Sequence, residues 1–130
     1  MQTLQQLRAR HALAQVQSWQ KTQKNSKLKA RASELPFMIH ANGLGQAADF
    51  FKSKGDKDGY QELFCALQSW LSQQQRPFAG QADLMDAIVK SDMHRYRLAQ
   101  AEAMAYMEWV KLFASAYLTA KETQPEEGQP

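Results

Sequence analysis

The chain has 130 residues, of which 44% are hydrophobic and 22% charged, a length and composition that fit one globular domain without a second core. A single cysteine and three dispersed histidines exclude a disulfide-stapled scaffold and give no zinc-ligand spacing. The net charge of +3 is uneven, because the first 33 residues carry seven basic residues and no acidic one, so this segment has a charge of +7 and the remainder −4.

The residue types favour helices along the whole chain. Val, Ile and Thr together number only nine, whereas Ala and Gln together number 36. We therefore predict an all-α fold, a single compact helical bundle of about six helices with a long C-terminal helix. Residues 1–120 form this domain, and residues 121–130, which contain two prolines and three glutamates, are expected to form an acidic disordered tail.

The first two predicted helices contain most of the basic residues. The first runs from about residue 3 to residue 21, with Thr3 as its N-cap and an apolar face that includes Val16 and Trp19. The second begins near residue 26. Pro36 lacks a backbone donor and clashes with the preceding turn, so we expect a kink or a restart there.

Two further helices follow the glycine turn at residues 42–45. Gly43 suits a left-handed helix stop, and Asn42 or Gly43 can begin the next helix, which is expected over residues 46–54. Asp58 is predicted to cap a fourth helix over residues 59–74.

The last part of the chain is predicted to hold a loop and two helices. Pro77 and Gly80 mark the loop, a short helix covers residues 82–90, and Asp92 caps the longest helix, which reaches about residue 120. From residue 103 onward this helix is apolar around most of its circumference. Such a helix belongs at the centre of a bundle or reserves one face for a partner. The candidate interface residues are Tyr106, Trp109 and Phe113.

No constellation typical of an enzyme appears in the sequence. There is no phosphate-binding loop, no di-iron pair and no metal-ligand spacing, so we expect no catalytic residue, no metal and no cofactor. His11 and His94 are expected to be exposed, and His40 to contact phosphate or cap a helix end. Cys65, in an apolar helical face, is expected to be a buried small hydrophobe.

The basic residues form several groups that suit a polyanion partner. Positive charge at a turn between helices reaches a phosphate backbone that a flat helix face does not reach. The alternative is an ordinary solvated face, or, for the lysines that end the third helix, an interaction with the helix dipole. The candidate RNA-binding residues are Lys21, Lys24, Lys27, Lys29, Arg31, His40, Lys52, Lys54, Arg95 and Arg97, with Lys57 beside the third-helix group.

The sequence indicates neither secretion nor a membrane span. The N-terminus lacks an apolar block, and the most apolar run, residues 103–118, is short and contains Glu108 and Lys111. We expect a cytoplasmic protein that has no membrane partner.

Three blocks of the sequence resemble a known family. They are the opening MQTLQQLRARHALAQV, the stretch LPFMIHANGLGQAADFFKSKG (35–55) and the stretch DLMDAIVKSDMHRYRLAQAEAMAYMEWVKLFASAYL (83–118). Together they resemble the small α-helical subunit of the type III-B CRISPR RNA-guided effector, the Cmr complex, over nearly all of residues 1–120.

The resemblance implies a non-catalytic subunit of a ribonucleoprotein involved in antiviral defence. Copies of such a subunit stack head to tail into a minor filament beside the backbone filament that holds the guide. The implied partners are the backbone and large Cmr subunits, further copies of the same chain, the guide crRNA and the target RNA. Contact with backbone phosphates suits this role, because base pairing and not the protein reads the target.

Two other functions remain open from the sequence. A helical DNA-binding or nucleoid-type protein would fit the basic N-terminal third, although the last helix turns apolar too early for a recognition helix. The other open function is that of a structural adaptor without nucleic-acid contact.

If Trp109 lies in the core, Trp109→Ala is expected to cost about 3–5 kcal/mol of stability.

Overall fold

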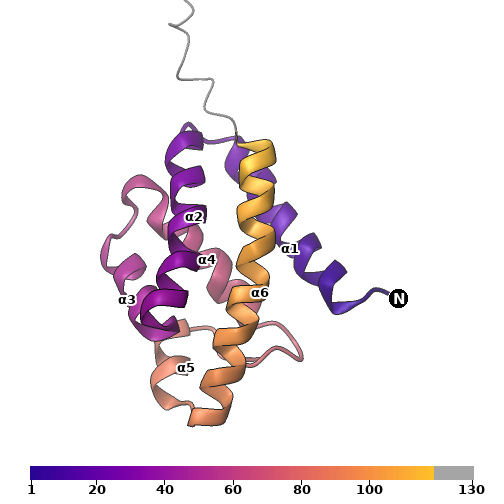
Figure 1. Cartoon of the computed structure of the whole chain (residues 1–130), viewed down its shortest axis with the longest axis vertical. Helices are drawn as coiled ribbons and strands as arrows, with labels where there is room; N and C mark the ends of the chain where they lie inside the picture. Colours follow the sequence, from indigo (N-terminus) through magenta and orange to yellow (C-terminus); the bar gives the residue numbers. More distant parts are fainter. Residues whose placement is uncertain (119–130) are drawn as a thin grey trace, which may run out of the picture.

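The computed structural model describes residues 1–118, and within them it contains six α-helices, one 3-10 segment and no strand (Figure 1). The all-α bundle of about six helices is therefore confirmed. The predicted tail at residues 121–130 lies outside the described residues. The elements are α1 (Leu4–Gln20), α2 (Asn25–Asn42), α3 (Leu44–Ser53), η1 (Lys57–Gly59), α4 (Tyr60–Leu71), α5 (Leu84–Lys90) and α6 (Met93–Tyr117).

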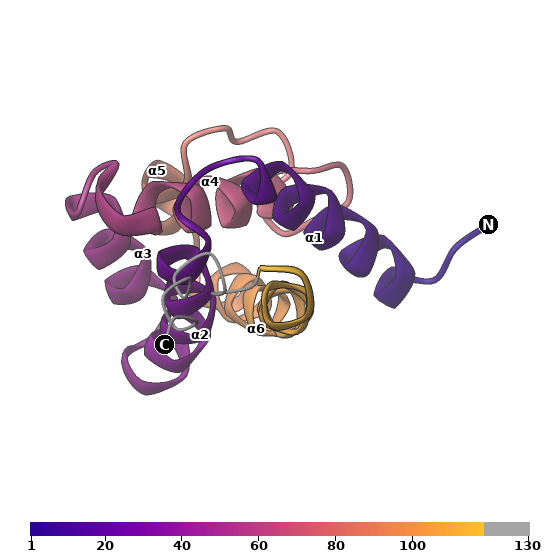
Figure 2. The same ribbon diagram turned by 90° about the horizontal axis from the view of Figure 1, so that it is seen from above.

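The long helices α2 and α6 lie side by side along the length of the molecule (Figure 1). Helix α1 packs against the other side of α6, and α3 packs against α2 (Figure 2). The turn between α1 and α2 and the end of α6 lie at one end of the long axis, whereas α5 and the start of α6 lie at the other (Figure 1). This arrangement separates the basic residues of α2 from those of α6.

The core is formed by the apolar faces of all six helices around α6. Its largest side chains without solvent contact include Phe51 of α3, Leu67 of α4, and Tyr106 and Met107 of α6. Burial of these side chains removes apolar surface from water, which stabilises the fold by roughly 25 cal/mol for each Å² buried. Helix α6 is central, as its wide apolar coat predicts, because α1, α2 and α4 all pack against it.

Most predicted helix boundaries agree with the structure. Thr3 forms a capping box with Gln6, and the Asp92 side chain accepts a hydrogen bond from the Arg95 amide at 2.8 Å, so both predicted N-caps are confirmed. Gly43 has a φ of 91° and lies between α2 and α3, as predicted. Helix α6 ends at Tyr117, slightly earlier than predicted, because Leu118 has extended backbone.

The structure excludes a restart at Pro36, one of the two outcomes predicted there, and contradicts the predicted cap at Asp58. Helix α2 continues through Pro36, which is buried in it, without the predicted restart. Packing of α2 along α6 offsets the hydrogen bond that Pro36 removes. Asp58 does not cap α4, because it has a left-handed φ of 52° inside η1 and Gly59 takes the N-cap position.

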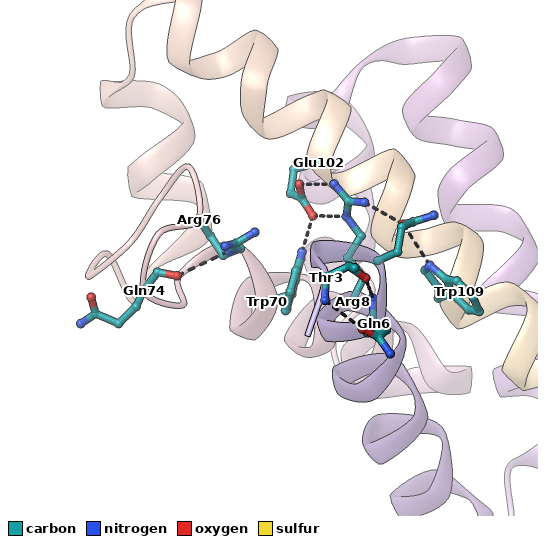
Figure 3. A network of polar contacts seen from close by, with 9 residues as sticks. Thr3, Gln6, Arg8, Trp70, Gln74, Arg76, Glu102 and Trp109 are labelled. Carbon is teal, nitrogen blue, oxygen red and sulfur yellow. Dashed lines mark hydrogen bonds and ion pairs between the residues drawn. The ribbon is translucent and has the colours of Figure 1, made fainter. Parts of the chain in front are cut away.

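A partly buried ion pair holds α1 against α6 (Figure 3). The Arg8 guanidinium donates two hydrogen bonds to the Glu102 carboxylate, at 2.6 and 2.8 Å, and the Trp70 indole donates a third at 2.8 Å. Burial raises the pKa of Glu102, but the hydrogen bonds from Arg8 and Trp70 outweigh it and hold the pKa below its ordinary value. The carboxylate is thereby kept ionised among apolar side chains.

Two residues are placed differently from the sequence prediction. His11 is half-buried between helices, where Nδ1 lies 2.6 Å from the Tyr106 hydroxyl and Nε2 lies 3.0 Å from Ser69 Oγ. Cys65 is exposed on α4, although the sequence predicts a buried position. The error at Cys65 comes from the helical phase, because the single step from the buried Phe64 to Cys65 turns the side chain by about 100°.

Candidate nucleic-acid interface

Basic side chains from three separate segments meet near one end of the molecule. The Lys24 ammonium group reaches the turn after α3, where it lies 3.4 Å from the Asp56 carbonyl oxygen, and Lys27 pairs with Asp58 of η1 at 2.9 Å. The charges of Lys57 and Arg31 also act on Asp58. We define the basic cluster as Lys24, Lys27 and Arg31 of α2 and its N-cap, Lys54 at the end of α3, and Lys57 of η1.

The Tyr60 ring joins two members of this cluster, Arg31 and Lys54. The Arg31 guanidinium carbon lies 4.5 Å from the ring centroid and the Lys54 ammonium nitrogen 5.9 Å from it. A cation over an aromatic face is attracted by the negative charge of the π system. Tyr60 therefore brings positive charge from α2 and from the end of α3 to one place.

Carboxylates partly neutralise the basic cluster. Lys24 pairs with Glu62 at 3.3 Å, and Arg31 pairs with Glu34 at 2.8 Å, in addition to the pair between Lys27 and Asp58. A hydrogen bond from Lys27 lowers the pKa of Asp58 below its ordinary value. The +7 charge of the first 33 residues is thus compensated only in part by acidic residues that follow them in the sequence.

The other candidate lysines are not held by carboxylates. Within residues 1–118, Lys21, Lys29, Lys52 and Lys54 make no ion pair. Lys21 is exposed at the α1 C-terminus, and Lys29 is half-buried on α2. The Lys52 ammonium nitrogen lies 5.3 Å from the Phe64 ring centroid, so this side chain extends over α4 at Phe64.

The glycine turn does not offer free amide groups to a phosphate. The Leu44 amide donates to Gln100 Oε1 and the Gly45 amide donates to the Tyr96 hydroxyl, both at 2.8 Å. These hydrogen bonds dock the start of α3 on α6. His40 is exposed in the last turn of α2, apart from these amides, so a phosphate contact there would depend on its own side chain.

Arg95 and Arg97 lie away from the basic cluster, at the start of α6 near the α5 end of the molecule (Figure 1). Arg95 is exposed, and its guanidinium donates to the Pro77 carbonyl oxygen at 2.7 Å. The ten candidate residues therefore occupy separate surfaces. In the sequence, Lys57 is grouped only with the lysines that end the third helix. In the fold, it belongs to the basic cluster.

The three candidate interface residues on α6 differ in their exposure to solvent. Tyr106 is fully buried and stacks on Trp70 with a centroid distance of 5.3 Å, so its prediction as an interface residue is wrong for the folded chain. Trp109 and Phe113 are half-buried, with ring centroids 5.7 Å apart, and Phe113 is followed by the 43% exposed Tyr117. Trp109, Phe113 and Tyr117 therefore present surface to a partner, whereas Tyr106 does not.

The described residues do not contain the features of a metal site or a membrane span. Residues 1–118 contain no group of three or more His, Cys, Asp or Glu side chains placed to hold a metal ion. None of the helices in this part of the chain combines the length and the hydropathy that crossing a membrane requires. The exposed basic side chains remain the feature with a defined chemical partner, because they attract a polyanion.

Comparisons with known proteins agree with the fold and with the sequence resemblance. The family model described as CRISPR-associated protein (Cas_Cmr5) matches residues 4–117. The chain is also similar to the X-ray crystal structure of a CRISPR-associated Cmr5 family protein from Thermus thermophilus, with 26% sequence identity and a TM-score of 0.78. This match covers 92% of the present chain and 100% of the other. None of the curated proteins compared with this chain matches it.

Proposed function

The chain belongs to the Cmr5 family of CRISPR-associated proteins, small subunits of the type III-B effector, and from this we propose that it contacts the guide and target RNA backbone without catalysing a reaction. The observation that carries the proposal is the meeting of Lys24, Lys27, Arg31, Lys54 and Lys57 from three segments. A surface of this kind binds phosphates of any sequence, which an RNA-guided complex requires.

The internal carboxylates limit how strongly a single copy binds RNA. Three cations of the cluster already have a protein partner, so a phosphate must compete with Glu34, Asp58 or Glu62. Several copies along one strand would add their weak contacts through a high effective concentration. We therefore expect weak binding by the isolated chain and a measurable contribution in the assembled complex.

Stacking of copies belongs to the same proposal. The half-buried Trp109 and Phe113, with the exposed edge of Tyr117, offer aromatic surface of the kind enriched at protein interfaces. Helix α6 ends beside the α1–α2 turn, since the Gln20 side-chain amide donates to the Tyr117 carbonyl oxygen at 3.2 Å. A neighbouring subunit seated on this aromatic surface would therefore lie close to the basic end of the molecule.

The cytoplasm is the compartment that we propose for this function.

The DNA-binding alternative has less support. It needs free base-reading side chains on α6, the helix after α5, and the Arg95 guanidinium there is hydrogen-bonded to a backbone carbonyl. The adaptor alternative differs from the RNA-binding proposal in one measurable property, the effect of the cluster lysines on RNA affinity.

The test is the affinity of the reconstituted effector for target RNA as a function of salt. The triple variant Lys27→Gln, Lys54→Gln and Lys57→Gln removes three positive charges of the basic cluster without adding an acidic side chain. We expect weaker binding and a salt slope that decreases by about one for each phosphate that the protein no longer neutralises. The matched control is Lys90→Gln on α5, which, like Lys27→Gln, removes a lysine paired with a carboxylate, here Asp86. Unchanged affinity and slope in the triple variant would instead support the adaptor.

A further inference from the structure

A groove between α2 and α3 borders the basic cluster and has a different chemistry. It has a volume of about 600 Å³ and opens to solvent. Its apolar part is formed by Met38 of α2 and Phe50 of α3, both half-buried. Its remaining walls carry polar side chains, those of Asn42, Gln46, Asp49 and Ser53.

Lys54 joins this groove to the basic cluster. Its ammonium nitrogen lies 4.8 Å from the centroid of Phe50, which lines the groove, and 5.9 Å from the centroid of Tyr60, which also carries Arg31. The Phe50 and Tyr60 rings themselves are in edge contact, with centroids 6.0 Å apart. A ligand with a phosphate at Lys54 would therefore have its neighbouring atoms at the mouth of the groove.

The rim of the groove favours a nucleobase over a second phosphate. Asp49 is exposed there and makes no ion pair within residues 1–118, so its negative charge repels phosphate. The same carboxylate accepts hydrogen bonds from the amino or imino N–H groups that every unpaired base carries, and the amides of Asn42 and Gln46 both donate and accept. An aromatic side chain beside such groups is the usual platform for an unpaired base.

We propose that the α2–α3 groove takes an unpaired nucleobase of a single strand whose phosphates lie on the basic cluster. This inference rests on the proposed function, because the strand must first be held at the cluster. Contact with the face or edge of Phe50 tolerates every base, since all bases have a π surface. The groove thus adds affinity without selecting a guide or target sequence.

The experiment compares two ligands on the purified full chain at low ionic strength. The ligands are an RNA octamer of uridine and an octamer with the same sugar-phosphate backbone but no bases, and amide chemical shifts report binding. We expect the uridine octamer to bind at least about fivefold more tightly, which is the lower end of the contribution of one stacked base. Shifts in the groove residues are expected with this octamer alone.

Groove variants separate this proposal from the phosphate contacts. Asn42→Ala with Gln46→Ala changes two exposed side chains, and Gln17→Ala on α1 is a matched control for loss of an exposed helical glutamine. Phe50→Leu keeps apolar volume but removes the ring. We expect the preference for uridine to fall in both groove variants and to persist in the control.

The outcomes distinguish the nucleobase site from the phosphate site. Equal affinity for both octamers, or a preference that survives both groove variants, would overturn the nucleobase site and leave the basic cluster intact. Failure of both octamers to bind, in the isolated chain and in the reconstituted effector, would overturn the proposed function as well.

Discussion

The charge of the half-buried His11 is coupled to the packing of α1. Its two ring nitrogens contact Tyr106 and Ser69, and its ring lies edge-on to Trp70 at a centroid distance of 5.4 Å. Burial lowers the pKa of His11 below its ordinary value of 6.5. The folded chain therefore binds this proton less readily than the unfolded chain does.

This difference predicts a pH dependence of stability. The contribution of neutral His11 is complete above pH 6.5 and decreases as the pH falls below it, because the unfolded chain then takes up the proton. Urea unfolding between about pH 7.5 and about pH 5 measures the effect. We expect His11→Gln to flatten the profile over this range, whereas His94→Gln, at an exposed position on α6, should leave it unchanged.

Glu102 acts in a separate pH range and does not obscure this result. Its pKa lies below its ordinary value of 4.5 in the folded chain, so its contribution is present above pH 4.5 and is lost as the pH falls through the folded-state pKa. A profile that stays as steep in His11→Gln as in the unmodified chain would show that the imidazole is not the group that titrates.

How much of the site could be predicted from the sequence depends on whether each side chain and its partner lie close together in the chain. The excess of lysine and arginine before residue 34 is visible in the sequence, and the cluster draws three members from it. The carboxylates Asp58 and Glu62 lie 31 and 38 residues from the lysines that they neutralise, and no local pattern connects them. His11 carries a local signal, since it shares a helical stripe with the half-buried Arg8 and Gln15, but charge grouping alone places it with the exposed basic residues.

At the scale of the elements, helices and caps are predictable where the signal is local. The Thr3 and Asp92 caps need only a side-chain oxygen and an amide three residues later. Sequence preferences fail at Pro36 and Asp58 because their conformations depend on packing between α2, η1 and α6. The continuous α2 matters for the site, because one unbroken helix carries both Lys27 and Arg31.

The close approach of η1 to α2 gives a prediction at the same scale. Gly59 has a φ of 87°, and a Cβ there would lie 3.0 Å from Leu28 Cδ2, whereas Gly55 has a φ of 64° and open space around it. Gly55→Ala is expected to cost about 1 kcal/mol through backbone strain alone. Gly59→Ala adds a steric clash, for a total of about 2–4 kcal/mol. If chemical denaturation gave the same loss of stability for both variants, Leu28 would move aside at little energetic cost.

At the scale of the whole molecule, the bundle places its basic and apolar surfaces at defined ends. The basic cluster and the end of α6 share one end, and Arg95 and Arg97 lie at the other (Figure 1). The sequence predicts the helix count and the types of residue at the surface, but not this division, because it depends on how α2 and α6 are paired in space. A subunit that repeats along RNA would use the first end for the strand and its neighbours.

The most direct test of RNA binding at the basic cluster is a map of protein–RNA cross-links in the reconstituted effector with guide and target RNA bound. Ultraviolet cross-linking followed by peptide mass spectrometry reports which segments of this subunit touch the strand. We predict cross-linked peptides from residues 21–31 and 50–60. Cross-links confined to the start of α6, or their absence from this subunit while neighbouring subunits are labelled, would contradict RNA binding at this end of the molecule.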